Sequence, residues 1–357
     1  MKCKICGKDS VEIAEVLGFC ISCLRTKPEK ALNLALHAHA RSRSEYNLPP
    51  QIPCSKNGLE CNLCANECKL GEGEKSYCGL RENKNGKIVT RVNSTTALLS
   101  FYLDAQPTNC CAAWFCEGAK ERGKYNLAVF FYGCNFDCLF CQNISHKRIE
   151  YAEICTSEEL VSEALKEKIN CICYFGGSPE PQLPFALHVS ERILEEVRGG
   201  KEQKRICWEW NGGGDKRLVR KAAELSLLSG GNIKFDLKAF DETLSIALSG
   251  VSNKRVKENF KMIGEEFWEV GMSRNKTPIL TATTLLVPGY VDEEEVEKIA
   301  KFIASVNPKI PYSLLVFHPD YKMKDLPITP ISQVERCYRA AKKYLEMVNI
   351  GNKHLLF

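Results

Sequence analysis

The chain has 357 residues, of which 44% are hydrophobic, and carries a formal net charge of +5. This length suits one large domain of about 200 to 250 residues with smaller appendages. The charge is mild and contains no long run of one sign, so we predict no dedicated nucleic-acid surface. No apolar run is long enough to span a membrane and the N-terminus shows no signal segment. We therefore expect a cytoplasmic protein without a membrane partner.

The first cysteine group lies at the N-terminus, within residues 1–26. Two Cys-x2-Cys pairs are separated by thirteen residues, a spacing typical of a zinc ribbon. The four ligands would be Cys3, Cys6, Cys20 and Cys23. Four thiolates close a tetrahedral site, so the metal would fold a segment too short for its own core. A rubredoxin-like iron site uses the same ligands, and zinc is favoured because it is redox-silent.

A helix and a proline-rich linker are predicted over residues 27–53, and a second cysteine-rich region over 54–126. Four cysteines of this region are spaced to bind either zinc or an auxiliary iron–sulfur cluster. They are Cys61, Cys64, Cys68 and Cys78. Spacing assigns no role to Cys54. For Cys110, Cys111 and Cys116, metal ligands and buried free thiols are equally good interpretations.

From residue 127 to 357 short apolar runs alternate with amphipathic helical stretches. The strand candidates are 127–132, 171–176, 206–210, 233–237, 279–287 and 312–317. Apolar strands separated by helices predict an α/β fold with a helix-covered parallel sheet. Six such units suit a partial (β/α)6 barrel better than a closed eight-unit barrel. In that architecture the functional residues lie at the carboxyl ends of the strands.

The first of these strands is followed by a Cys-x3-Cys-x2-Cys triplet, Cys134, Cys138 and Cys141. Three thiolates at this spacing can hold three corners of a [4Fe-4S] cluster and leave one iron open for a substrate. The alternatives are a structural zinc knuckle or an electron-transfer cluster, although a closed zinc site needs a fourth ligand. The triplet resembles the signature of the radical SAM superfamily. In that superfamily the open iron binds the amino and carboxylate groups of S-adenosylmethionine (SAM).

The later strand ends resemble the pyruvate formate-lyase activating enzyme group of this superfamily. Residues 176–180, GGSPE, are similar to its Gly-Gly-Glu-Pro motif, which holds the SAM amino group. Ser178 stands where the acid is expected, so the resemblance gives that role to Glu180 or to backbone carbonyls around Gly176 and Gly177. Residues 209–212 resemble an acid-x-Asn-Gly segment near the ribose, and residues 236–238 an Asp-Leu-Lys motif.

The same resemblance implies further contacts around SAM. Glu209 and Asp236 would hold a monovalent cation, which would balance their buried charge. Asn211 would lie near the ribose and Lys238 would face the negative end of the cofactor. The remaining predicted cofactor-binding residues are Tyr132, Phe140, Gln142, Asn143 and, at the rim, His318.

The expected function is reductive cleavage of SAM to a 5'-deoxyadenosyl radical that abstracts hydrogen from a protein or peptide. A glycyl-radical activase or a post-translational modification enzyme would act in this way, with ferredoxin or flavodoxin as reductant. The cysteine-rich segment before the triplet resembles that of an archaeal and bacterial branch of the group. Two alternatives stay open. One is a radical SAM enzyme for a small molecule, in cofactor biosynthesis or methylation, and the other is a non-catalytic electron carrier or zinc-ribbon adaptor.

Overall fold

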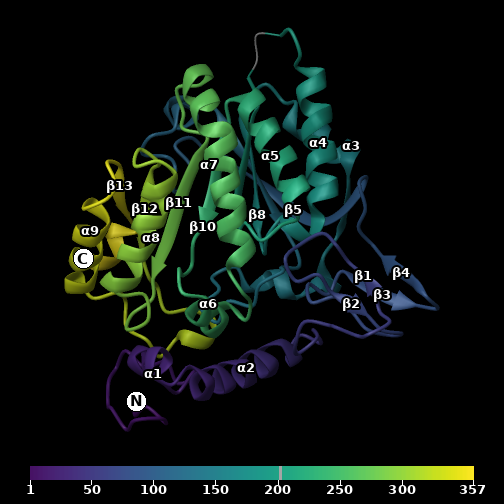
Figure 1. Ribbon diagram of the computed structural model, residues 1–357. Coiled ribbons are helices and arrows are strands. Elements are labelled where there is room, and N and C mark those ends of the chain that lie inside the picture. The colour runs from purple at the N-terminus through teal and green to yellow at the C-terminus, as the bar shows by residue number, and fades with distance from the viewer. Residues whose placement is uncertain (201–202) are drawn as a thin grey trace.

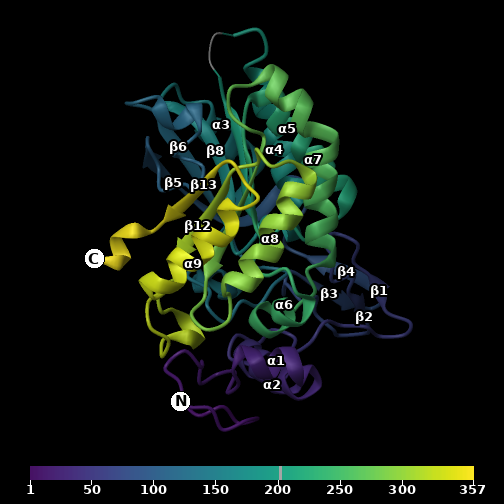
Figure 2. The same ribbon diagram turned by 60° about the vertical axis from the view of Figure 1, so that its left-hand side comes forward.

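The computed structural model describes residues 1–200 and 203–357. A nine-stranded sheet forms its centre, in the order β13-β12-β11-β10-β9-β8-β6-β5-β7 (Figures 1 and 2). Neighbouring strands from β6 to β13 along this order are parallel, whereas β5 is antiparallel to both β6 and β7. The strands are β5 (Thr96–Ala105), β6 (Tyr125–Phe131), β7 (Ile154–Thr156), β8 (Ile169–Gly176), β9 (Arg205–Trp210), β10 (Ile233–Asp236), β11 (Leu280–Leu286), β12 (Tyr312–Val316) and β13 (Val348–Gly351).

Helices that follow the strands cover the outer face of the sheet (Figures 1 and 2). They are α3 (Ser157–Ala164), α4 (Leu183–Glu196), α5 (Lys216–Ser229), α6 (Glu242–Ser249), α7 (Lys254–Arg274), α8 (Glu293–Val306) and α9 (Ile331–Lys342). Short 3-10 turns occur at Glu117–Lys120, Ile144–Lys147, Ile149–Tyr151, Glu180–Gln182, Tyr321–Met323 and Lys353–Leu356. This arrangement confirms the predicted α/β fold.

Local signals explain where these helices begin and end. The Thr156 hydroxyl accepts a hydrogen bond from the Glu159 amide at the start of α3, and Glu159 bonds back in a capping box. Asp292 caps α8 through the amide of Glu295. Helix α5 ends at Gly230, which adopts the left-handed conformation that favours glycine.

Side chains alternate across the central strands and divide the interior into two parts. Even-numbered residues of β8 and β9 pack under the helices, where Tyr174 stacks on Trp208 with ring centroids 4.7 Å apart. Trp208 in turn stacks on Trp210 at 5.4 Å. The odd-numbered residues of the same strands therefore face the inside of the barrel. This second set supplies the polar and sulfur groups considered below.

All six predicted strands are present, and four elements of the sheet and its cover were not predicted: β5, β7, β13 and α9. Strand β7 has only three residues, too few to show a pattern. Strand β5 lies inside the region assigned to the second cysteine group, and its antiparallel pairing with β6 links the two regions. Strand β13 is only four residues long and half-buried, so its sequence shows little pattern. Helix α9 packs on α8, and its amphipathic sequence could have been recognised.

The N-terminal segments lie at the end of the barrel where the cysteine triplet is found. Helices α1 (Ile21–Thr26) and α2 (Pro28–Ser44) run beneath α6, and a small cysteine-rich region lies beside them (Figure 1). Its strands are β1 (Leu59–Glu60), β2 (Lys69–Leu70), β3 (Arg81–Lys84) and β4 (Lys87–Thr90). None of the helices in the described part of the chain is long and apolar enough to cross a membrane.

Candidate active site

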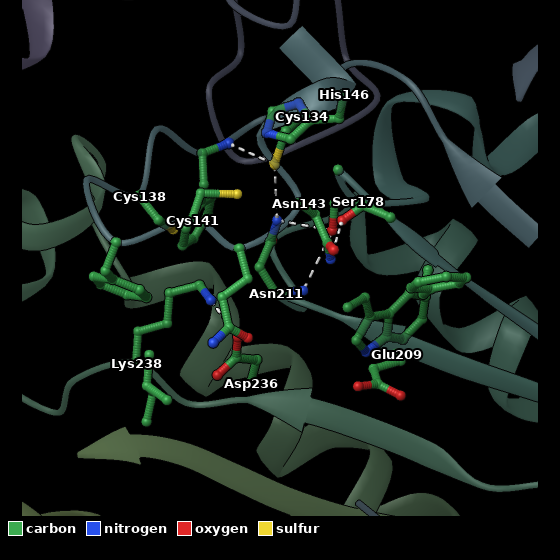
Figure 3. Close-up of a pocket in the computed structure, with 18 of the residues that line it drawn as sticks. Cys134, Cys138, Cys141, Asn143, His146, Ser178, Glu209, Asn211, Asp236 and Lys238 are labelled. Atoms are coloured by element: carbon green, nitrogen blue, oxygen red, sulfur yellow. Dashed lines mark hydrogen bonds and ion pairs between the residues drawn. The ribbon is translucent and has the colours of Figure 1, made fainter. Parts of the chain in front are cut away.

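The cysteine triplet lies on the loop that leaves the carboxyl end of β6. Cys134 is buried, and Cys138 and Cys141 are partly exposed to a cavity (Figure 3). The amide of Phe136 donates to the Cys134 sulfur at 3.3 Å, and the Ser249 hydroxyl lies 3.4 Å from the Cys138 sulfur. Burial, with the neighbouring Cys138, raises the pKa of Cys141 to about 12. Because these thiols do not ionise readily by themselves, a bound metal is the natural way to hold them as thiolates.

The cavity encloses about 960 Å³ of space between its atoms and opens to solvent on one side. Most of the predicted site residues line it. They are Cys134, Cys138, Phe140, Cys141, Gln142, Asn143, Gly176, Gly177, Ser178, Glu209, Asn211, Asp236 and Lys238. The carboxyl ends of β6, β8, β9 and β10 thus meet at one site, as the strand order requires.

Three predicted residues do not line this cavity, because each is held elsewhere. The Tyr132 ring packs beside the apolar cluster of Cys78 and Leu80. His318 is half exposed, and its Nδ1 lies 3.0 Å from a carboxylate oxygen of Asp320. Glu180 is fully buried and accepts a hydrogen bond from the Gly212 amide at 2.6 Å. Glu180 therefore supports the loop after β9 and does not reach the cavity.

The two glycines after β8 allow the chain to pack closely against the triplet loop. Gly176 has a φ of +112°, and a Cβ at this position would collide with the backbone of Phe131. A Cβ on Gly177 would collide with the carbonyl oxygen of Gly133 and with the His146 ring. Glycine is therefore required here for steric reasons.

Ser178 and Asn211 form a buried polar network at the back of the cavity. The Asn211 side-chain amide donates to the Ser178 hydroxyl at 2.9 Å and to the Asn135 side-chain oxygen at 2.7 Å. It also lies 3.9 Å from the Cys134 sulfur. Asn135 belongs to the triplet loop, so this network ties the loop to the ends of β8 and β9. The resulting wall is rigid and polar where a charged ligand would lie.

Two carboxylates and one lysine occupy the opposite side of the cavity (Figure 3). Asp236 ends β10 and forms an ion pair with Lys238. Glu209 on β9 lies 3.8 Å from the ammonium of Lys234. Enclosure by the cavity walls raises the pKa of Glu209 to about 7, although Lys234 opposes the shift. A monovalent cation beside these acids would balance their charge, as the resemblance implies.

The N-terminal helix α2 holds the triplet loop through one buried carboxylate. Asp137, between two of the cysteines, is fully buried and lies 2.8 Å from His39 Nδ1 and 3.6 Å from Arg43 Nη1. It also forms an ion pair with Lys147. Burial alone would raise the pKa of Asp137, but His39 and Lys147 hold it below its ordinary value. Sequence reasoning missed this role because the partners lie far apart along the chain.

The second cysteine group docks directly on the same loop system. Its four members, Cys61, Cys64, Cys68 and Cys78, are buried. The Ala65 amide donates to Gly213 O at 2.8 Å and the Asp215 amide to Leu63 O at 2.9 Å. Asn66 donates to the carbonyl of Asn135 in the triplet loop at 2.7 Å. Any cofactor in this group would therefore lie against the active-site wall.

The first cysteine group has the geometry of a single tetrahedral ion. The four ligand atoms all lie within 4.8 Å of one another. The Cys3 and Cys23 sulfurs are 3.7 Å apart, and those of Cys6 and Cys20 are 3.8 Å apart. Zinc–sulfur bonds of about 2.3 Å in a tetrahedron place the sulfurs about 3.8 Å apart. The sulfurs of the second group and of the triplet are spaced more widely. Among these described residues, no three sulfurs of either group all lie within 4.8 Å of one another.

A family model described as the radical SAM superfamily matches residues 128–303. The chain carries a radical SAM domain. The match spans the sheet from β6 to β11 and extends into α8, and it includes the triplet and all the residues that line the cavity except Leu315 on β12. The domain makes the chain an enzyme whose chemistry takes place at an iron–sulfur cluster.

Curated relatives of this radical SAM protein include activating enzymes. An uncharacterized protein of Methanocaldococcus jannaschii is 26% identical over 83% of this chain and 82% of its own. A putative glycyl-radical enzyme activating enzyme of the same organism is 31% identical over 53% of this chain and 66% of its own. The isethionate sulfite-lyase activating enzyme of Desulfovibrio desulfuricans is 33% identical over 40% of each chain. These relatives agree with the predicted resemblance to the activating enzyme group.

Several residues of the radical SAM cavity were not predicted as ligand-binding residues. They are Phe136, His146, Phe175, Trp210, Thr283, Leu285 and Leu315. Thr283, Leu285 and Leu315 are alternate residues of β11 and β12 that face the barrel interior. The period of two along these strands could have identified them once the inward face was known. His146 carries no such signal, because it comes from a 3-10 turn after the triplet.

Proposed function

We propose that this radical SAM enzyme acts on a protein or peptide, and specifically that it activates a glycyl-radical enzyme. The observation that carries the proposal is the set of three thiols facing Glu209, Asp236 and Lys238 across one cavity. Bound there, an iron–sulfur cluster and SAM supply the one-electron chemistry that generates a 5'-deoxyadenosyl radical. The named activities of the relatives favour a protein as the final hydrogen donor.

The chain's own residues would bind and orient SAM around that chemistry. Cys134, Cys138 and Cys141 would hold the cluster, and the tight Gly176–Gly177 turn would bring backbone groups to the SAM amino end. Asn211 would fix the ribose side, with Ser178 as its partner. The remaining contacts would come from Phe140, Gln142, Asn143, Glu209, Asp236 and Lys238. The apolar walls around them would keep water from the reacting atoms.

An exposed aromatic ring beside the cavity supports a macromolecular substrate. Tyr102 on β5 is 52% exposed. Its ring centroid lies 6.2 Å from that of Phe175, and Phe175 lines the cavity. An exposed tyrosine ring beside a cavity mouth suits contact with a protein segment.

The test is an anaerobic assay of the reconstituted enzyme with dithionite as reductant. We expect 5'-deoxyadenosine from SAM, and none from a variant in which Cys134, Cys138 and Cys141 are all alanine. Addition of a glycyl-radical protein from the same genome should produce a glycyl radical signal in electron paramagnetic resonance. If 5'-deoxyadenosine forms and an added metabolite is converted, but no protein radical appears, the small-molecule alternative would be favoured. A fully loaded wild type that makes no product would favour an electron carrier.

We further propose zinc at Cys3, Cys6, Cys20 and Cys23. The tetrahedral sulfur spacing supports a single ion, and zinc is the redox-silent ion that such ribbons commonly bind. Metal analysis should give about one zinc per chain, because four thiolates close the coordination of one ion. The Cys6→Ser variant should lose this zinc. Iron with a rubredoxin-type absorption spectrum in place of zinc would overturn this assignment.

A further inference from the structure

A second cavity lies inside the barrel, closer to the amino ends of the strands than the active site. The space between its atoms amounts to about 390 Å³, part of which is open to solvent. Five cysteines line it: Cys110, Cys116, Cys171, Cys173 and Cys207. None of them belongs to the triplet or to the two N-terminal groups. The cavity therefore gathers sulfur from β8, β9 and the segment between β5 and β6.

Strand alternation explains why these thiols converge. Cys171 and Cys173 on β8 precede Phe175, which lines the active-site cavity on the same face of the sheet. Cys207 on β9 likewise precedes Glu209, and Cys173 is the register partner of Cys207. The two cavities are thus stacked along the inside of the barrel.

The sulfur atoms are close enough to share a ligand. The Cys171 and Cys207 sulfurs are 3.4 Å apart. The ligand atoms of Cys110, its neighbour Cys111 and Glu209 all lie within 4.8 Å of one another. Glu209 lines the active site as well, so it stands at the boundary between the two cavities.

A buried lysine shows that this cavity is suited to negative charge. Lys234 on β10 is 2% exposed, and its ammonium lies 3.4 Å from the Cys173 sulfur and 3.8 Å from Glu209. A fully buried ammonium is costly unless anions surround it. If the thiols were neutral, Glu209 would be the single anion within 4.0 Å of the Lys234 ammonium among the described residues. Thiolates bound to a metal cluster would supply the missing negative charge.

We propose that this cavity holds an iron–sulfur cluster, with its ligands drawn from the five cysteines. No three of these five sulfurs all lie within 4.8 Å of one another, in contrast to the single-ion site at the N-terminus. Wider spacing suits a cluster, whose thiolates bind different iron atoms. The proposal does not depend on the substrate of the enzyme.

The experiment compares metal content between cysteine variants of the full chain, expressed with added iron and purified without oxygen. One variant pair is Cys171→Ser with Cys207→Ser on the strands. The other is Cys110→Ser with Cys116→Ser on the connecting segment. Iron, acid-labile sulfide and zinc are measured per chain, with Mössbauer spectra of 57Fe-labelled protein. Cys155→Ser and Cys337→Ser are matched controls, because both residues are buried and lie outside every cysteine group described above.

Both variant pairs should lose the same amount of iron and sulfide, about two to four of each, the content of one cluster. The controls should lose none. The variant lacking Cys134, Cys138 and Cys141 should keep this iron, which separates the result from the proposed activity. Circular dichroism checks folding, and the connecting-segment pair decides the question if the strand pair fails to fold. Unchanged iron in that pair, zinc in place of iron, or a Cys171–Cys207 disulfide in the wild type would each overturn the proposal.

Discussion

Glu180 is a buried carboxylate whose charge is poorly compensated. It is 0% exposed, and one of its oxygens has no hydrogen-bond partner among the described residues. Burial raises its pKa to about 7, although hydrogen bonds to Ser178 and to backbone amides partly oppose the shift. The folded state therefore binds more protons than the unfolded chain between about pH 4.5 and about pH 7. Stability should fall as the pH rises through this window.

Glu180→Gln should remove this pH dependence, because glutamine keeps an acceptor for the Gly212 amide and carries no charge. Thermal unfolding should show the variant more stable than wild type at pH 8, by at most about 3 kcal/mol. The stabilities of the variant and of the wild type should be nearly equal at pH 4.5. The exposed Glu269→Gln serves as control and should change stability by less than about 0.5 kcal/mol at either pH. A variant less stable than wild type at pH 8 would show that the carboxylate is needed.

Gly177 determines how closely β8 approaches the triplet loop. Gly177→Ala should displace the Gly133 carbonyl and cost about 1 to 3 kcal/mol in unfolding free energy. Formation of 5'-deoxyadenosine should fall on the order of 100-fold, since misplacement by about 1 Å is enough for such a loss. Gly86→Ala is the control for activity, because a Cβ there meets nothing within 4 Å and the strain from its φ of +70° is confined to the β3–β4 turn, so 5'-deoxyadenosine formation should be unchanged. Normal activity in Gly177→Ala would mean that the loop adapts.

Asp137 connects two elements, the triplet loop and α2. Asp137→Asn should leave Lys147 and Arg43 without their buried counter-charge and cost about 3 to 5 kcal/mol, measured by urea unfolding. The exposed pair of Asp320 with His318 provides a control, and Asp320→Asn should cost less than about 1 kcal/mol. An equal loss of unfolding free energy in both variants would show that the buried network contributes no more to stability than an exposed ion pair.

We expect the N-terminal segment, residues 1–26, to need the proposed metal for its fold. It packs on the barrel through Tyr290, whose hydroxyl accepts from the Ala14 amide at 3.0 Å and donates to the Phe19 carbonyl at 2.8 Å. Removal of the metal by a chelator should increase hydrogen exchange across residues 1–26 and leave β8 to β11 protected. The same experiment on Cys6→Ser should show the increase without chelator. Protection that persists after complete metal removal would contradict a metal-dependent fold.

The whole molecule carries two N-terminal cysteine groups and a sulfur-lined cavity in addition to the triplet of its active site. SAM should bind between several strand ends and so stabilise the whole barrel. At 100 times its dissociation constant it should add about 2.7 kcal/mol, seen as a higher melting temperature. The variant without Cys134, Cys138 and Cys141 should show a much smaller shift. An equal shift in that variant would show that SAM binds without the cluster ligands.

The features that depend on local spacing were predictable from the sequence. The triplet, the N-terminal quartet and the six strands were all readable, because ligand spacing and apolar periodicity are properties of neighbouring residues. The resemblance to the activating enzyme group then implied that Glu209, Asp236 and Asn211 belong to one site. These predictions needed no knowledge of long-range contacts.

Only the tertiary structure decided which residues meet across the barrel. Glu180 and His318 stand near strand ends in the sequence, yet one is buried under Gly212 and the other pairs with Asp320. Asp137 bonds to His39, which lies on a helix 98 residues earlier in the chain. Strand alternation turns Cys171, Cys173 and Cys207 to the barrel interior, and the segment between β5 and β6 brings Cys110 and Cys116 to the same cavity. Such convergence depends on sheet order and side-chain direction, which spacing along the chain does not specify.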